Sequence, residues 1–260
     1  MTLPTIDIYS WEITSILLLS GFLVGVVNTF AGRGTLITYS LFMRLGLPAN
    51  VANGTIRMGV VMQTLTSSWE FHKKKLLDIK KGLIFSIPNT IGSLLGAQLA
   101  ALTDKDIFEK IVGIVMLGML FFIFYKPEKW IHGQASKISR KPGYMQQIIF
   151  FLLGFYGGFI HIGVGIFLLA ALVLNEGYDL VKANALKVFI VFIYSPFTLL
   201  IFILNGQVHY GLGLISAIGN VIGAYFAARF AIKKGSDFIR WILVIIILVF
   251  AAHLFGIIHF

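Results

Sequence analysis

Two short glycine-containing stretches carry the polar side chains best suited to bind a ligand. The first reads Asn-Thr-Phe-Ala-Gly-Arg-Gly at 28–34, and the second reads His-Ile-Gly-Val-Gly at 161–165. Each interrupts a run that is otherwise apolar. Lipid cannot satisfy free backbone N–H and C=O groups, so such an interruption persists only where protein or water covers it. Glycine breaks at matching places in two halves of a chain indicate a transporter's substrate site.

Arg33 lies in the first break, with no carboxylate near it in the sequence. A guanidinium at membrane depth is unfavourable unless it is paired or hydrated. We therefore predict that Arg33 clamps a sulfonate, sulfite or carboxylate through two hydrogen bonds. Backbone N–H groups of the half-helix that begins near Gly34 would add to this site. The alternative is that the break lies near a membrane surface, where Arg33 simply reaches water.

Asn28 and His161 take corresponding places in the two breaks. We predict that both side chains converge on the ligand, and His161 can carry a proton near neutral pH. The plainer interpretation is that each forms hydrogen bonds to a helix end, as buried Asn and His often do. Four glycines, Gly32, Gly34, Gly163 and Gly165, are predicted to be structural.

Asn53 and Asn184 form a second symmetric pair, further along each half. Thr55, Arg57 and Lys187 follow them within about one helical turn. Capping of the next helix is the simple role for the two asparagines. That role is compatible with substrate contact, and we include all five residues in the predicted site.

The charges favour an anionic ligand. All 11 Asp and Glu residues lie outside the apolar runs or at their edges, whereas basic residues enter the break motifs. A carrier of cations usually needs a carboxylate inside a span. The chain has no Cys, so it has no thiolate catalysis and no cysteine-based metal site. We expect no cofactor and no metal.

The elements that position these residues are apolar helices. Of the 260 residues, 58% are hydrophobic and the mean hydropathy is +0.89. The apolar runs are continuous rather than alternating, which predicts an all-α polytopic membrane protein rather than a β-barrel. The apolar segments lie at 13–31, 35–46, 51–71, 82–101, 107–125, 146–161, 164–175, 183–204, 209–230 and 238–256.

Two of these segments, 35–46 and 164–175, are unusually short. At about 1.5 Å per residue, each covers half of a hydrocarbon layer about 30 Å thick. Each is therefore predicted to be one half of a broken or re-entrant helix pair.

The two halves of the chain resemble each other. Three motifs recur in the same order, with 21–25 matching 154–158, 51–54 matching 182–185, and 92–97 matching 219–224. Ordered matches favour a true repeat over chance similarity of glycine-rich helices. We predict a single membrane domain over 1–260, with repeat one at 13–126 and repeat two at 145–257, each of about five helical segments. The paired glycines at 92/96 and 219/223 are predicted to allow close helix packing.

Basic loops give the predicted orientation. Lys and Arg cluster at 73–81, 126–141 and 229–240, and we place these loops in the cytoplasm. Both termini then lie outside and the two repeats are inverted, as in many alternating-access carriers. The same rule explains the net charge of +10 without any nucleic-acid partner.

Three motifs of the first half, at 21–25, 28–37 and 45–57, resemble the sulfite exporter TauE/SafE family of membrane transporters. The stretches at 154–165 and 178–188 are similar to the family's second repeat, and the resemblance covers about 15–257. It implies an integral carrier for sulfite, organosulfonates and related small anions in a bacterial inner membrane. The positions that match the family motifs are Asn28, Gly32, Gly34, Asn53, Gly54, Thr55, Arg57, Gly163, Gly165, Asn184 and Lys187.

This sequence departs from the family pattern at three positions. Arg33 stands in a run of glycines, Ile56 stands in place of Asn, and His161 stands in place of Gln. An added fixed cation suits a larger or more strongly charged anion, so these departures bear on the identity of the substrate.

We therefore expect a multi-pass inner-membrane transporter of small oxyanions, most simply sulfite or an organosulfonate, that works by alternating access and is not an enzyme. Its partners would be the small anion, the lipid bilayer and, as an open alternative, a second copy in a homodimer. An anion channel could use the same basic site with faster flux and no counterflow. An intramembrane hydrolase would need Ser195 with His161 or His209, and none of these lies in a recognisable motif.

Overall fold

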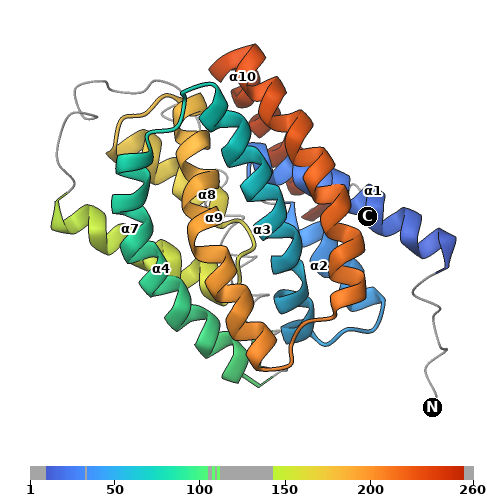
Figure 1. Cartoon of the computed structure of the whole chain (residues 1–260). Helices are drawn as coiled ribbons and strands as arrows, with labels where there is room; N and C mark the ends of the chain where they lie inside the picture. The colour runs from blue at the N-terminus through green and yellow to red at the C-terminus, as the bar shows by residue number, and fades with distance from the viewer. Residues whose placement is uncertain (1–9, 33, 105–106, 109, 112–142, 255–260) are drawn as a thin grey trace.

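The computed structural model of the chain describes residues 10–32, 34–104, 107–108, 110–111 and 143–254 (Figure 1). These residues form helices and no strand, so the predicted all-α fold is confirmed. The helices are α1 Trp11–Phe30, α2 Thr35–Arg44, α3 Ala49–Lys73, α4 Ile79–Leu102, α7 Tyr144–Phe159, α8 Val164–Ala170, the π-helix η2 Ala171–Asn175, α9 Leu180–Leu204 and α10 Tyr210–Leu254.

Among the described residues, four helices are long and apolar enough to cross a membrane: α1, α4, α9 and Tyr210–Leu243 of α10. Helix α3 is equally long, with 25 residues, but it buries a polar series that includes Asn53, Arg57 and Gln63. It lies between α9 and α10 and packs against both (Figure 1). Neighbouring helices therefore shield its polar face from lipid, which explains how so polar a helix sits at the centre of the molecule.

Both predicted breaks are present. Helix α1 ends at Phe30 and α2 begins at Thr35, while α7 ends at Phe159 and α8 begins at Val164. The following half-helices are short: α2 has 10 residues, and α8 has 7 before it passes into the 5 residues of η2. The half-span lengths expected from the sequence are thus observed.

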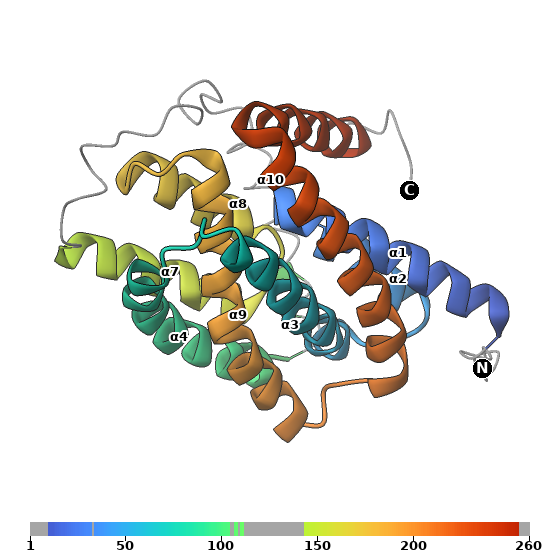
Figure 2. The ribbon, with the colours of Figure 1, turned by 45° about the horizontal axis from the view of Figure 1, so that its top comes forward.

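A third interruption divides α10. Gly235 has φ 78° and ψ −168°, outside the helical region, and Figure 2 shows the change of direction there. This agrees with the separate segments predicted at 209–230 and 238–256. Most of the segment predicted at 107–125, the basic loop at 126–141 and both chain termini lie outside the described residues. The repeat boundaries and the orientation of the termini therefore stay predictions.

Glycines allow two equivalent helix contacts at opposite edges of the molecule, α1 on α10 and α4 on α7 (Figure 1). A Cβ atom at Gly25 would clash with the carbonyl of Asn220, and one at Gly223 would clash with that of Phe22. At the other edge, Gly158 faces the carbonyl of Ser93 in the same way. The predicted packing role of the paired glycines is confirmed. Such paired contacts are what two structural repeats would produce, while their relative inversion stays a prediction.

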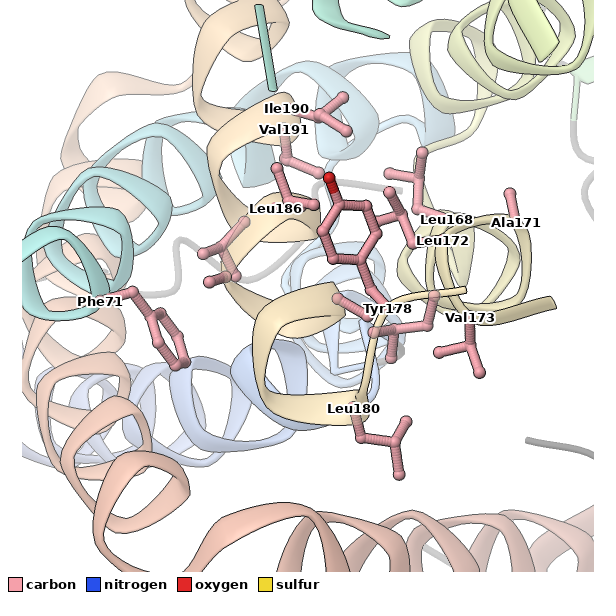
Figure 3. Packing of buried hydrophobic residues seen from close by; sticks show 14 of the residues in the cluster. Phe71, Leu168, Ala171, Leu172, Val173, Tyr178, Leu180, Leu186, Ile190 and Val191 are labelled. Carbon is pink, nitrogen blue, oxygen red and sulfur yellow. The ribbon is translucent and has the colours of Figure 1, made fainter. Parts of the chain in front are cut away.

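An apolar cluster includes residues of the half-helix that follows the second break. Figure 3 shows Tyr178 between Leu172, on the η2 side, and Leu186 of α9, and all three are almost fully buried. The Tyr178 hydroxyl donates a hydrogen bond of 3.2 Å to Oδ2 of Asp78, which also caps the first turn of α4. The loop between η2 and α9 is thereby fixed to the beginning of α4.

Candidate substrate site between the two helix breaks

The two breaks touch each other through bare backbone. A Cβ atom added at Gly165 would lie 2.5 Å from the Cα atom of Gly32, and one added at Gly32 would also clash with Gly165. Gly32 has φ 70°, a left-handed conformation that glycine adopts without strain. Only glycine on both sides permits this approach, so the breaks form one joint region at the centre of the fold.

Lys187 of α9 holds the end of α1. Its Nζ atom donates to the carbonyl oxygens of Asn28 at 3.0 Å, Thr29 at 2.8 Å and Phe30 at 3.5 Å. The last carbonyls of a helix have no partner within the helix, and a cation there also interacts favourably with the helix dipole. Lys187 is 2% exposed, so its ammonium reaches these oxygens inside the protein.

Arg57 of α3 holds the end of α7 in the same way. Its Nη1 atom donates to the Gly157 carbonyl at 3.2 Å, and Nη2 donates to the Gly158 carbonyl. The guanidinium also lies over the ring of Phe202, 4.7 Å from its centre, and the residue is fully buried. The arrangement is reciprocal, because a cation from each half of the chain binds the carbonyls at the end of the broken helix in the other half.

Neither buried cation has an acidic partner in the described part of the chain. The ion pairs there join Glu70 to Lys73 and Arg229, and Asp179 to Lys182. Both cations contact neutral carbonyl oxygens, and Arg57 also lies over the ring of Phe202. Two such charges give the joint region a positive potential that low-dielectric surroundings screen weakly.

Asn53 and Asn184 differ in their bonding. Asn53 Nδ2 donates to the Phe159 carbonyl at 2.9 Å, next to the two carbonyls that Arg57 holds. Asn184 is fully buried, and neither atom of its amide has a partner in the structure. In the first break the corresponding carbonyl, that of Phe30, is taken by Lys187. The Asn184 amide is thereby left without the hydrogen bond that its counterpart Asn53 makes.

Other polar atoms near the first break are also unpaired. Asn28 Oδ1 accepts a hydrogen bond of 3.2 Å from the backbone N–H of Thr35, but its Nδ2 has no partner. The hydroxyls of Thr35 and Thr38, one turn apart at the beginning of α2, have none either. Buried polar groups are normally hydrogen-bonded, so this cluster suits a bound water or ligand.

His161 and Thr55 are held by the protein itself. His161 Nδ1 lies 3.2 Å from the hydroxyl of Tyr194, and the residue is buried. Thr55 donates to the Val51 carbonyl at 2.7 Å and accepts from the His209 backbone N–H at 2.9 Å, which ties α3 to the chain before α10. Contact of either residue with a substrate stays a prediction.

The structure changes the correspondence between the breaks. The sequence aligns Asn28 with His161, but His161 has φ 67° and lies two residues past the end of α7, as Gly32 lies two residues past the end of α1. The reason is that α1 continues five residues beyond Gly25, whereas α7 continues only one beyond Gly158. His161 is thus the conformational counterpart of Gly32, and Asn28 is the counterpart of Gly157.

The remaining predicted site residues are Arg33, Gly34 and Gly163. Arg33 lies outside the described residues, so its predicted clamp on the anion stays a prediction. Gly34 and Gly163 immediately precede α2 and α8, and Gly163 has the left-handed φ of 77°. Within the ranges that the structure describes, no group of three or more His, Asp or Glu side chains could hold a metal ion.

Sequence reasoning missed some residues. Thr35 and Thr38 carried a usable signal, since they stand three residues apart directly after the break and so share one helix face. Tyr194, the partner of His161, carried none. Glu176 was placed in a loop at the edge of an apolar run, yet it is only 3% exposed and its Oε1 has no partner in the structure. Burial raises the pKa of Glu176, and the nearby charge of Lys81 partly opposes that shift.

Comparison with known proteins finds relatives that are described as membrane transporters. A chain of Sinorhizobium described as "Probable membrane transporter protein ORF9" is 24% identical over 245 residues, which cover 94% of this chain and 93% of that protein. A "Probable membrane transporter protein" of Haemophilus influenzae is 27% identical over 239 residues, covering 90% and 91%. "Probable membrane transporter protein YfcA" of Escherichia coli K12 is 27% identical over 234 residues, covering 89% and 86%.

No solved structure matches the chain significantly. The family described as "Sulfite exporter TauE/SafE" matches residues 17–254, which is nearly all of the sequence. The chain is therefore a membrane transporter that belongs to the sulfite exporter TauE/SafE family.

Proposed function

We propose that this protein is a secondary transporter of small oxyanions, sulfite or an organosulfonate, which bind between the two breaks. The observation that carries the proposal is the pair of buried cations, Arg57 and Lys187, whose charges no carboxylate of the described chain neutralises. The family's printed description names sulfite export, and three relatives are described as membrane transporters.

Two kinds of group would bind the anion. Some would attract it by their positive charge, and others would donate hydrogen bonds to it. Arg57 and Lys187 use their N–H donors on helix ends, so they contribute mainly charge, although Arg57 Nε remains unpaired. The amides of Asn28 and Asn184 have free N–H donors. Asn184 lies three residues before Lys187 on the same face of α9, and Lys187 contacts the carbonyl of Asn28. We expect these donors to face the same anion, and Arg33 would add a third positive charge beside those of Arg57 and Lys187.

Alternating access would use the glycine contact as its pivot. Gly32 and Gly165 bring two backbones together with no interlocking side chains, which lets one broken pair shift against the other. Inverted repeats with a site at such a junction are a frequent design of secondary carriers. The proposal includes an inner-membrane location with both termini outside, and leaves room for a homodimer.

An anion channel would use the same charges, so transport mode needs its own test. A hydrolase finds no support, because Ser195 Oγ has no hydrogen-bond partner in the structure and His161 pairs with Tyr194 instead. Radiolabelled sulfite and taurine would be measured in proteoliposomes, with and without unlabelled anion on the opposite side. A carrier shows counterflow, and a channel does not.

Site variants then locate the binding region. We expect Arg33→Ala and Asn184→Ala each to lower sulfite or taurine uptake at least tenfold, while Lys182→Ala, an exposed lysine of α9, keeps it. Thermal shift with sulfite, sulfate, taurine, sulfoacetate and simple carboxylates identifies the anion, since a ligand at about 100 times its dissociation constant stabilises by about 2.7 kcal/mol. Unchanged transport in both site variants would refute the proposed site.

A further inference from the structure

The end of α1 gathers three carbonyl oxygens around one point. The oxygens of Asn28, Thr29 and Phe30 all accept from the single Nζ atom of Lys187, at 3.0, 2.8 and 3.5 Å. They are the last three carbonyls of α1, and that of Asn28 also accepts a hydrogen bond of 3.0 Å from the backbone N–H of Gly32. Carbonyls at the C-terminal end of a broken helix are the groups that coordinate a coupling Na⁺ in carriers with discontinuous helices.

We propose that this end of α1 is a monovalent-cation site and that the ammonium of Lys187 is its built-in occupant. The inference rests on the proposed function only because transport is one of its readouts. The charge that other carriers take from solution would here be covalently attached to α9. Transport by the wild-type protein then needs no Na⁺.

The bonding of Lys187 fits this role better than direct contact with an anion. An ammonium has three N–H donors and no acceptor, and all three carbonyls of the site lie within 3.5 Å of it. Because the N–H donors of Lys187 are already used on these carbonyls, Lys187 attracts a neighbouring anion by its charge rather than by hydrogen bonds. Lys187 is buried and has no acidic partner in the described part of the chain, so the three oxygens are its main stabilisation.

The second break shows that this arrangement is particular to the first. There, the carbonyls of Gly157, Gly158 and Phe159 are divided between Arg57, which takes two, and Asn53, which takes one. A planar guanidinium spreads its donors, so its partners need not converge on a point. The end of α7 therefore offers no comparable site for a spherical cation.

The test removes the built-in cation and supplies a free one. Uptake of radiolabelled sulfite would be measured in proteoliposomes containing either Na⁺ or choline, for the wild type, Lys187→Ala and Lys187→Met. We expect equal wild-type rates in both salts. Lys187→Ala should lose at least 90% of its uptake in choline and regain several-fold in Na⁺ or ethylammonium. Lys187→Met fills the space without charge and should not recover.

Controls separate this site from general effects of salt. Lys182→Ala, one exposed lysine on the same helix, should match the wild type in both salts. Arg57→Ala should lose uptake and gain nothing from Na⁺ or ethylammonium. Equal recovery of Lys187→Met, or full activity of Lys187→Ala in choline, would overturn the cation site.

A stability readout keeps the test independent of transport. The thermal midpoint of purified Lys187→Ala should rise with Na⁺ over choline, while that of the wild type should not. If the alanine variant is not recovered, Lys187→Ser, which leaves the same space and adds an oxygen, takes its place. A midpoint that does not respond to Na⁺ or ethylammonium would contradict the cation site, whereas a wild type that moves no oxyanion would contradict only the proposed function.

Discussion

The carbonyl oxygens at the two helix breaks are bound by different side chains. At the end of α1, Lys187 alone binds three carbonyls, whereas at the end of α7 Arg57 and Asn53 share them. Because Lys187 binds all three carbonyls of the first break, the amide of Asn184 has no partner, whereas the amide of its counterpart Asn53 binds a carbonyl. We therefore expect the ligand to bind at the first break, and the second break to serve mainly as a scaffold.

The half-helices after the breaks differ in the same sense. Helix α2 begins with two unpaired hydroxyls, those of Thr35 and Thr38. Helix α8 is almost wholly apolar and passes into the π-helix η2, a rare form that often marks functional sites. The second half-helix thus has few polar groups to offer a ligand, and it differs from α2 in its irregular backbone.

The contact between the breaks should give the largest effect when disturbed. In Gly32→Ala and Gly165→Ala the new methyl group meets the opposing backbone, so we expect at least a tenfold loss of transport and a poor yield of folded protein. Gly206→Ala is the matched control, because Gly206 has φ 67° and nothing within 4 Å of an added Cβ. It should show only backbone strain, of about 1 kcal/mol. Fluorescence-detected chromatography and uptake measure both effects, and equal behaviour of Gly32→Ala and Gly206→Ala would show that the breaks need not touch.

The clamp on α7 should come next in size. In Arg57→Lys a single ammonium replaces a fork that binds two carbonyls and lies over Phe202. A buried acceptor left without a partner costs about 1–3 kcal/mol, so we expect a loss of about that size in the free energy of unfolding and a lower thermal midpoint. A midpoint equal to that of the wild type would mean that a point charge serves both breaks equally well.

The two asparagines should respond in opposite ways. Asn53→Ala leaves the Phe159 carbonyl unpaired and should lower stability by about 1–2 kcal/mol with a smaller effect on transport. Asn184→Ala removes an amide that has no partner, so stability should be unchanged or slightly higher, while uptake falls at least tenfold. Paired thermal and uptake measurements on both variants decide the matter. Equal destabilisation would contradict the assignment of Asn184 to the ligand and Asn53 to the scaffold.

Much of this comparison was accessible from the sequence. Composition predicted the membrane helices, and glycine breaks predicted where α1 and α7 end, because both follow from local rules of burial and backbone conformation. The pairing of Asn53 with Asn184 also came from the repeat. The partners of Arg57 and Lys187 did not, because contacts between residues 100 or more positions apart depend on how helices pack.

The residue-by-residue correspondence between the two breaks could not be predicted from the sequence, for a similar reason. Glycine motifs fix where α1 and α7 cross their neighbours, but not how far each helix continues past the crossing. That length decides whether His161 corresponds to Asn28 or to Gly32. The burial of Glu176 was not predicted, because the residue stands at the end of an apolar run and its burial depends on how the helices pack.

Glu176 should give the smallest effect among these tests of the difference between the two half-helices. Helix α2 ends in the exposed Arg44, whereas η2 ends at a buried carboxylate. Because burial raises the pKa of Glu176 above the usual 4.5, folding favours its protonated form. That stabilisation is complete below the usual pKa and is lost as pH rises through the raised one. The wild-type thermal midpoint should therefore fall over this interval, by a few degrees at most.

Glu176→Gln keeps the shape of the side chain and removes its titration, so this part of the pH dependence should disappear. Thermal midpoints of the detergent-purified protein between pH 4.5 and 8 measure it, and Glu12→Gln, an exposed carboxylate at the beginning of α1, should follow the wild-type curve. If Glu176→Gln also followed that curve, the carboxylate would not be buried in the folded protein. The second half-helix would then end in solvent as the first does, and the two breaks would differ only in how their carbonyls are held.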